Sequence, residues 1–255
     1  MKTVVSEPRD IKELLARSAV YRALAMVLRH PDDDTRKWLA AREHHRLLEV
    51  MALGSNGEAG LREAARRLAA ALDAASMAEW SRDYERIFGH SVQSAAPPYE
   101  LEYGEEHSHR QPQELGDIAA FYQAFGLRAS FASHERVDHI ATECEFLHYL
   151  LYKHACAVDE EAAEHAQVCD AATRQFLADH LGRWGPAFCL RLSRAAGSGI
   201  EGAAATMVLG WLSQECARMG VPLGSCDLPL RSPTEQDAVG CAACALPQGK
   251  PANGC

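Results

Sequence analysis

Residues 138–151 read DHIATECEFLHYLL, and this stretch decides both the expected fold class and the first candidate site. At about 100° per residue, Ile140, Leu147 and Leu151 fall on one side of a helix. His139 and Glu143 extend the same apolar arc. The stretch therefore predicts an amphipathic helix whose buried face also carries two polar groups.

These two polar groups lie four residues apart, so their side chains can meet on one face of the helix. A buried His139–Glu143 pair would satisfy itself through a charge-assisted hydrogen bond. One interpretation is a structural pair that fixes the orientation of the helix. The other is a pair that a binding partner reaches. The opposite side of the helix would carry four polar side chains, Asp138, Thr142, Glu145 and Tyr149.

The helical period recurs along most of the chain, and no stretch is a convincing β-strand. The sequence therefore predicts an all-α fold, with one globular multi-helix domain over residues 1–220. Residues 221–255 are rich in Cys, Pro and Gly, have no period and are expected to form an irregular tail. The helices are expected at residues 11–30, 34–53, 61–75, 77–89, 115–125, 135–156, 160–181, 184–196 and 201–219.

Composition narrows the class of partner. The 255 residues carry a formal net charge of −9, from 35 acidic and 26 basic side chains. This balance argues against a nucleic-acid backbone or an anionic membrane and favours a basic partner segment. The first residues, MKTVVSEPRD, lack an apolar leader, and no later window has the length and apolarity of a membrane span. The sequence predicts a cytoplasmic protein that does not insert into a membrane.

Residues 89–116 interrupt the helical pattern with an irregular segment that contains three prolines. A loop this long within a compact domain is more often functional than idle. The chain has no glycine-rich phosphate loop and no Gly-x-Ser-x-Gly elbow. These usual signatures of catalysis are missing.

Two metal sites are open alternatives. Glu145-x-x-His148 and Glu106-x-x-His109 both fit the Glu-x-x-His pattern of carboxylate-bridged di-iron bundles, although the second falls in the irregular segment. The tail offers four thiols with spacings that permit zinc or an iron–sulfur cluster, or else a redox-responsive pair. These thiols belong to Cys226, Cys241, Cys244 and Cys255.

Three motifs in order along the chain resemble one known family. Glu135-Arg-Val-Asp-His139, with the helix that follows it, is similar to the Glu-Pro-x-Asp-His signature of the TorD/DmsD/NarJ chaperones, which mature molybdoenzymes. Tyr84-Glu-Arg-Ile-Phe88 resembles the family's Tyr-x-x-Leu-Phe motif. Pro97-Pro-Tyr-Glu100, followed by Tyr103, resembles its Pro-Pro-Tyr-Glu-Ser-x-Tyr loop. The resemblance covers roughly residues 10–220 and departs from the family at Arg136 and Leu101, where proline and serine are usual.

The resemblance implies a helical chaperone that is not an enzyme and requires no cofactor. Such a protein binds the leader or N-terminal segment of a molybdoenzyme catalytic subunit and delays export until the molybdenum cofactor is inserted. Its partners would be that subunit and molybdenum-cofactor delivery proteins. The residues that the resemblance assigns to client binding are Glu135, Asp138, His139, Glu143, Tyr99 and Glu100.

Two hypotheses follow for the roles of the residues in this site. His139 and Glu143 would order a hinge between helices, while Asp138 and its polar helix face meet the client. The acidic loop around Glu100 would offer carboxylates to the two guanidinium groups of a twin-arginine leader. The rival reading is a metal-binding helical protein, either a di-iron bundle or a redox sensor built on the cysteine tail.

Overall fold

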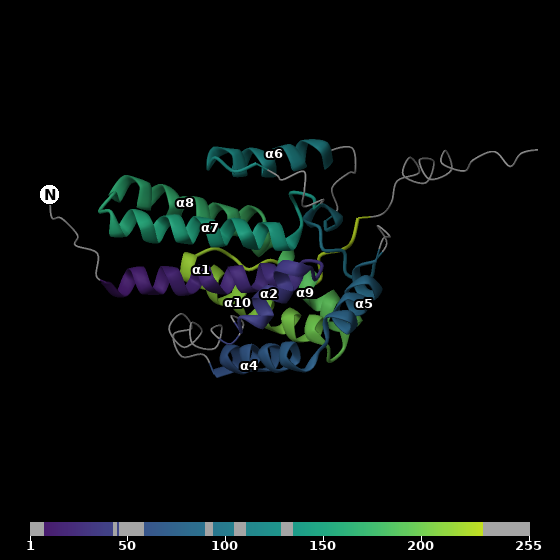
Figure 1. Ribbon diagram of the computed structural model, residues 1–255. Coiled ribbons are helices and arrows are strands. Elements are labelled where there is room, and N and C mark those ends of the chain that lie inside the picture. The colour runs from purple at the N-terminus through teal and green to yellow at the C-terminus, as the bar shows by residue number, and fades with distance from the viewer. Residues whose placement is uncertain are drawn as a thin grey trace, which may run out of the picture.

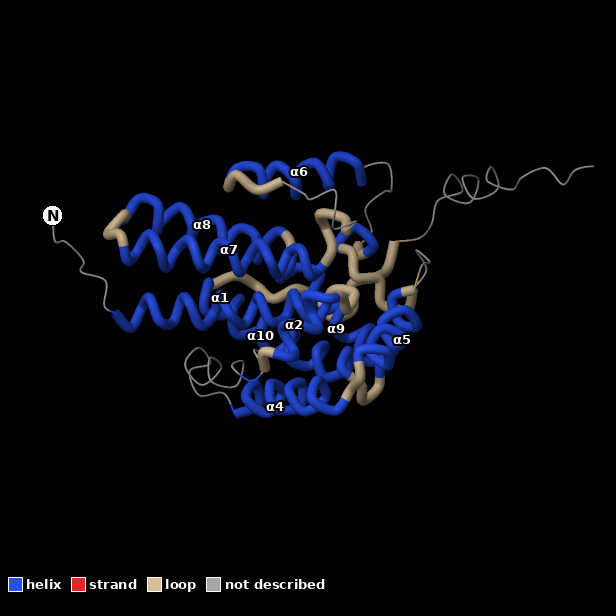
Figure 2. The backbone as a smooth tube through the Cα atoms, in the orientation of Figure 1, coloured by secondary structure: helices blue, strands red, loops and turns tan. Residues whose placement is uncertain are grey.

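A computed structural model describes residues 8–42, 45, 59–89, 94–104, 111–128 and 135–231. Over these residues the fold is all-α, as predicted, and contains no strand (Figure 2). Two isolated β-bridges join Tyr99 to His139 and Tyr103 to Leu230. Both bridges hold irregular segments that the helical period does not account for.

The helices follow one another through short connections or through the undescribed segments. They are α1 (Pro8–Leu28), α2 (Asp33–Ala40), α4 (Ala59–Ala74), α5 (Met77–Phe88), the short 3-10 helix η1 (Glu100–Glu102), α6 (Gln111–Ala124), α7 (Ile140–Asp159), α8 (Ala163–Asp179), α9 (Leu181–Ala196) and α10 (Ile200–Met219).

Local sequence explains several helix ends. Asp32 accepts a hydrogen bond from the backbone N–H of Thr35 at 2.9 Å and so caps α2. Ser76 and Glu79 form a capping box at the start of α5. The predicted start of α7 at Glu135 is wrong by five residues. His139 caps that helix, and the residues before it pair with another segment instead.

The helices stack in layers around a shared apolar core. α1 runs along α7, α8 covers the neighbouring side of α7, and α9 and α10 complete the body with α4 against α10 (Figure 1). The largest fully buried side chains include Trp80, Trp184 and Trp211. Close packing of these large rings explains how a chain that is only 7% aromatic builds one continuous core.

Helix α6 lies beyond α7 and α8, on the side away from α1 (Figure 1). Aromatic rings hold it there: Phe121, Tyr122 and Phe125 all lie within 6 Å of the Phe146 ring on α7. The Tyr122 hydroxyl also donates to the carbonyl of Val137 at 2.8 Å. The end of α6 therefore forms a wall next to the segment that precedes α7.

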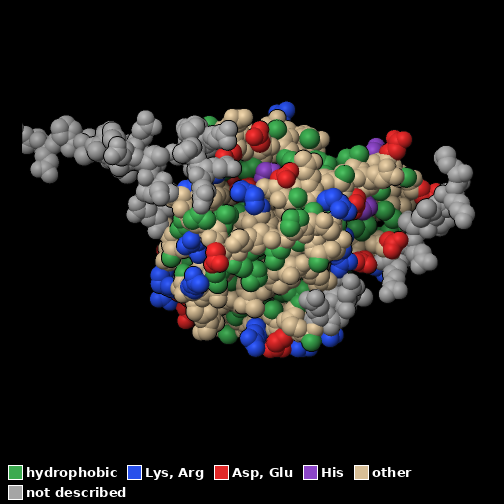
Figure 3. Space-filling model, turned by 180° about the vertical axis from the view of Figure 1, so that it is seen from behind, with side chains coloured by type: hydrophobic (Ala, Val, Ile, Leu, Met, Phe, Trp, Pro, Cys, Tyr) green, Lys and Arg blue, Asp and Glu red, His purple; other side chains and the backbone are tan. Residues whose placement is uncertain are grey.

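The surface mixes both signs of charge. On the face shown in Figure 3, acidic and basic side chains are interspersed rather than separated into patches. Among the described helices, none has the length and apolarity needed to cross a membrane.

Residues 221–231 form an irregular strap that packs back on the helical body. The backbone N–H of Gly224 donates to the carbonyl of Gly182 at 2.9 Å, and that of Arg231 donates to Glu102 at 2.9 Å. Gly104 in turn donates to Pro229 at 2.8 Å. The first part of the predicted tail is thus irregular but anchored, while residues 232–255 lie outside the described part of the chain. The boundary between domain and tail stays a prediction.

We expect Gly224→Ala to lower the free energy of unfolding by about 2 kcal/mol, because a Cβ atom there would overlap the carbonyl oxygen of Arg183. The strap would have to move and lose its hydrogen bond to Gly182. Urea denaturation followed by circular dichroism measures the change. Gly116→Ala is the matched control, since open space surrounds that position in α6, and it should be neutral or stabilising. Equal stability of the two variants would contradict the anchored strap.

Candidate functional site

The segment before α7 pairs with the loop around η1 through backbone hydrogen bonds. Glu100 N–H donates to the carbonyl of Asp138, and Ile140 N–H donates to that of Pro98, both at 2.9 Å. The Tyr99 ring lies edge-on to His139 with 5.2 Å between centroids. The structure therefore brings together the two sequence motifs at residues 97–103 and 135–139, which are far apart in the chain.

Asp138 lies at the centre of this junction and is fully buried. Its carboxylate accepts from Arg136 Nε at 2.9 Å and Nη2 at 2.7 Å, and from the backbone N–H of Leu101 at 3.2 Å. We expected this side chain to project from the polar face of the helix, and that geometry is wrong. Asp138 precedes the helix, so helical periodicity does not set its direction.

Arg136 connects the junction to its surroundings. Beyond Asp138, its guanidinium donates to Glu102 at 3.2 Å and lies over the Tyr99 ring at 4.5 Å from the centroid. Arg136 occupies the position at which the TorD/DmsD/NarJ chaperones usually have proline. Here an arginine donates charge-assisted hydrogen bonds to Asp138, in the segment before α7, and to Glu102, in η1.

His139 acts as the N-cap of α7. Its Nδ1 accepts from the backbone N–H of Ala141 at 3.1 Å, which leaves the proton on Nε2. Burial, together with the positive charge of Arg136, lowers the pKa of His139 to about 3. The neutral ring keeps its Nε2 atom 3.7 Å from Glu135 Oε2. No described group accepts a hydrogen bond from Nε2, so this N–H is a buried donor beside a carboxylate.

Glu143 does not pair with His139, contrary to the sequence expectation. Both carboxyl oxygens lie within hydrogen-bond distance of Trp184 Nε1, at 3.2 and 3.1 Å, and the group also hydrogen-bonds to Glu100. Burial and the nearby charge of Glu100 raise the pKa of Glu143 well above its usual value. The environment of Glu143 therefore favours its neutral form.

Glu100 carries the charge of this carboxyl pair. His180 Nδ1 lies 3.0 Å from Oε2, and Arg183 donates to Oε1 at 2.6 Å. Although burial opposes it, contacts with His180 and Arg183 lower the pKa of Glu100. Sequence reasoning placed Glu100 in an exposed acidic loop, but the structure buries it. Its role is to anchor the loop to the junction of α8 and α9.

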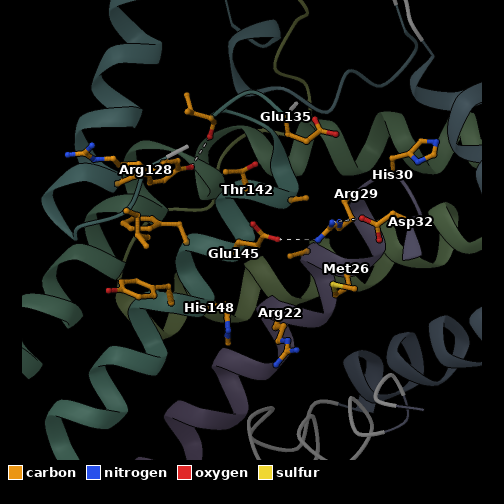
Figure 4. Close-up of a pocket in the computed structure, with 17 residues that line it drawn as sticks. Arg22, Met26, Arg29, His30, Asp32, Arg128, Glu135, Thr142, Glu145 and His148 are labelled. Atoms are coloured by element: carbon orange, nitrogen blue, oxygen red, sulfur yellow. Dashed lines mark hydrogen bonds and ion pairs between the residues drawn. The ribbon is translucent and has the colours of Figure 1, made fainter. Parts of the chain in front are cut away.

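A cavity of about 700 Å³ opens beside the junction around Asp138 (Figure 4). Its walls come from α1, from α7 and from the end of α6, with the residues just before α7 at one edge. Apolar side chains line much of it, including Met26, Leu127, Val137 and Phe146. Arg29 also lines the cavity and forms ion pairs with two carboxylates, Asp32 at 2.5 Å and Glu145 at 3.7 Å.

Glu135 is the predicted site residue that lines this cavity. Its side chain is 29% exposed, and burial raises the pKa of its carboxyl, which the charges of His30 and Arg29 partly offset. Among the described residues, no Lys or Arg lies within 4 Å of it. Tyr99 is half-buried, and the other four predicted residues are buried. The polar helix face nevertheless reaches the cavity through Thr142, Glu145 and Tyr149.

Sequence reasoning missed the contribution of α1. Arg22 and Met26 line the cavity from that helix, and Arg29 and His30 line it from the residues just after the helix ends at Leu28. Their spacing of three and four residues marks one face of a helix, which was the available signal. The signal was weak because nothing in the sequence shows that this face of α1 lies against α7.

The two metal alternatives find no support in the described residues, which contain no group of three His, Cys, Asp or Glu side chains placed to hold an ion. Glu145 pairs with Arg29, and His148 Nδ1 donates to the carbonyl of Ser18 at 3.0 Å. Cys226 is a half-buried free thiol. The rest of both patterns lies outside the described residues, so the cysteine-tail site stays a prediction; these positions are Glu106, His109, Cys241, Cys244 and Cys255.

Comparison with known proteins gives the family. A family model described as nitrate reductase delta subunit matches residues 56–190. The perchlorate reductase assembly chaperone protein of Dechloromonas aromatica (strain RCB) is 30% identical over 183 residues, which are 69% of this chain and 77% of that protein. The chlorate reductase assembly chaperone protein of Ideonella dechloratans and the selenate reductase assembly chaperone protein of Thauera selenatis are each 39% identical over 79 residues, which are 31% of this chain and 39% of each relative. The chain therefore belongs to the nitrate reductase delta subunit family, of the NarJ/TorD type, and is a maturation chaperone rather than an enzyme.

Proposed function

We propose that this chaperone works in the cytoplasm on the catalytic subunit of a molybdoenzyme of the dimethyl sulfoxide reductase superfamily. It binds the subunit's leader or N-terminal segment and assists cofactor insertion and assembly before export or complex formation. Molybdenum-cofactor delivery proteins are further partners in this proposal. The names of the relatives support it, since each is an assembly chaperone of an oxyanion reductase.

The observation that carries the proposal is the cavity beside the hinge with Glu135 at its edge. An apolar floor and a carboxylate that has no Lys or Arg partner among the described residues match a client segment that has a basic side chain next to an apolar stretch. A twin-arginine leader has this chemistry. The guanidinium of the client would neutralise Glu135, whose carboxylate loses hydration in the cavity.

The buried residues of the hinge serve as positioning residues in this proposal. His139 presents its Nε2–H beside Glu135, so a small movement of the carboxylate would complete a hydrogen bond that orients it. Asp138, Glu100 and Glu143 hold the loop and α7 at fixed positions around the cavity. Tyr99 remains half-exposed next to them and offers a ring to the client.

We expect Glu135→Gln to weaken binding of a synthetic twin-arginine leader peptide about tenfold, because a desolvated charge pair is lost while the shape stays the same. Fluorescence anisotropy with a labelled peptide measures the affinity. Glu164→Gln, an exposed site on α8, makes the same change in net charge and should leave the affinity unchanged. The two variants should unfold with nearly the wild-type free energy. Equal effects on binding would remove Glu135 from the site.

The client itself is identified by purifying the tagged chain from its native cytoplasm, with mass spectrometry of the bound proteins and metal analysis of the eluate. Recovery of an immature molybdoenzyme catalytic subunit is the expected result. Its recovery should drop in the Glu135→Gln variant and persist in Glu164→Gln. Chaperone that carries stoichiometric iron and no subunit would return the metal-binding alternative.

A further inference from the structure

The cavity lies between α1 and α7, with the end of α6 on a third side. The two helices run antiparallel here, because Arg29 pairs with Glu145 near the hinge while Ser18 contacts His148 further along. From Ala141 to Tyr152, α7 is about 16 Å long at about 1.5 Å per residue. This length accommodates about three turns of a helical client segment.

Two exposed apolar side chains lie on the same two helices, beyond the residues that line the cavity. Leu15 is 42% exposed and precedes Arg22 by two helical turns, so it lies on the same face of α1. Tyr152 is 49% exposed, follows Glu145 by two turns on α7, and its ring lies 6.5 Å from that of His148. Large apolar side chains that stay exposed near the cavity add to the surface that a client segment can cover.

The two ends of the cavity differ in charge. Figure 4 places Glu135 and His30 at one end, and Arg22 and His148 at the other. Arg22 is exposed, and no carboxylate among the described residues lies within 4 Å of it. Burial and the charge of Arg22 lower the pKa of His148. That end of the cavity therefore carries a cation that no carboxylate of the described residues pairs with. Between the ends, Arg29 is already neutralised by Asp32 and Glu145.

We infer that the cavity recognises a second charge in its client, a carboxylate that pairs with Arg22. Along the client this carboxylate lies beyond the basic group that meets Glu135 and before an apolar side chain that covers Leu15 and Tyr152. The client is thus an amphipathic segment with a defined order of base, apolar stretch, acid and apolar residue. This inference rests on the proposed function and adds the orientation of the segment. A segment bound in reverse would place like charges together at both ends.

Three labelled peptides of about fourteen residues, about 21 Å as a helix, test the inference. The first has arginine near its start and glutamate two turns later, with leucines between and after them. The second replaces the glutamate with glutamine, and the third replaces the arginine with glutamine. Affinities are measured by fluorescence anisotropy at low salt, where exposed charges are least screened.

The wild-type protein should bind the first peptide about fivefold tighter than the second, which is the size expected for an exposed ion pair. In Arg22→Gln this preference should vanish. Arg194→Gln, an exposed arginine on α9, should retain it. A preference that survives in Arg22→Gln, or that is absent in the wild type, overturns the inference.

The third peptide separates this inference from the proposed function. If the wild type binds the first peptide more tightly than the third but binds the first and second equally, only the proposed recognition of the glutamate is wrong. If it binds the first peptide more tightly than the second but binds the first and third equally, the proposed role of Glu135 in binding a basic group is wrong. Leu15→Ser and Tyr152→Ser should each weaken all three peptides about threefold by the lost apolar contact. Val168→Ser on α8, where the side chain is 57% exposed, is the control and should have no effect.

Discussion

Asp138→Ala is expected to lower the free energy of unfolding by about 3 kcal/mol. The substitution removes two charge-assisted bonds to Arg136 and leaves the buried N–H of Leu101 without its acceptor. We place the effect at the low end for a broken buried ion pair, because the Arg136 side chain is 38% exposed and regains water. Urea denaturation of the full chain measures the change.

Asp138→Asn is the matched control, since it keeps an oxygen for the Leu101 N–H and removes only the charge. It should lose about half as much stability. Peptide binding shows whether Asp138 only positions the loop or contacts the client directly. Because Asp138 is buried, both folded variants should weaken leader binding only as far as the loop at residues 97–103 is displaced. A large loss of affinity in Asp138→Asn with unchanged stability would show that Asp138 touches the client.

The position of Asp138 also shows what the sequence alone could not predict. The apolar period predicted α7 and its buried face, because that information is local to the helix. It could not predict that residues 135–139 form a bridge with Tyr99 instead of a helical turn. That pairing depends on a segment almost forty residues away, so Asp138 was assigned the direction it would have inside a helix.

The same reason explains the partners of Glu143. Its burial followed from the helical face, but Trp184 comes from α9 and Glu100 from a loop. Spacing within one helix instead suggested His139 as a partner. Likewise, Glu135 was named from its motif, whereas Arg22 entered the site only when packing placed α1 beside α7. Local pattern predicted which residues are unusual, and tertiary packing decided what each of them contacts.

His139→Asn should remove a large part of the acid sensitivity of the fold. The pKa of His139 is about 3 in the folded chain, below the ordinary value near 6.5, because burial disfavours the charged ring. Between these values the unfolded chain binds a proton that the folded chain does not bind. Stability is therefore fully present above about pH 6.5 and falls by about 1.4 kcal/mol per unit as the pH decreases towards 3.

Asparagine keeps an acceptor for the Ala141 N–H, so α7 retains its N-cap without a titrating group. The wild type and the variant should differ little at pH 7.5, apart from the packing lost with the ring. At pH 5 the difference should shift by about 2 kcal/mol in favour of the variant. Urea denaturation at both pH values measures this shift, with His165→Asn, an exposed histidine on α8, as the control.

Glu143 acts in the opposite direction and must be separated from this effect. Its folded pKa is raised, so the folded chain holds a proton that the unfolded chain releases, and stability falls as the pH rises above about 4.5. The wild-type profile contains both slopes together with those of other shifted groups such as Glu100 and Glu215, whereas the difference between wild type and His139→Asn isolates the histidine. A pH-independent difference would mean that the ring is not held neutral by burial, and the N–H beside Glu135 would lose its assigned role.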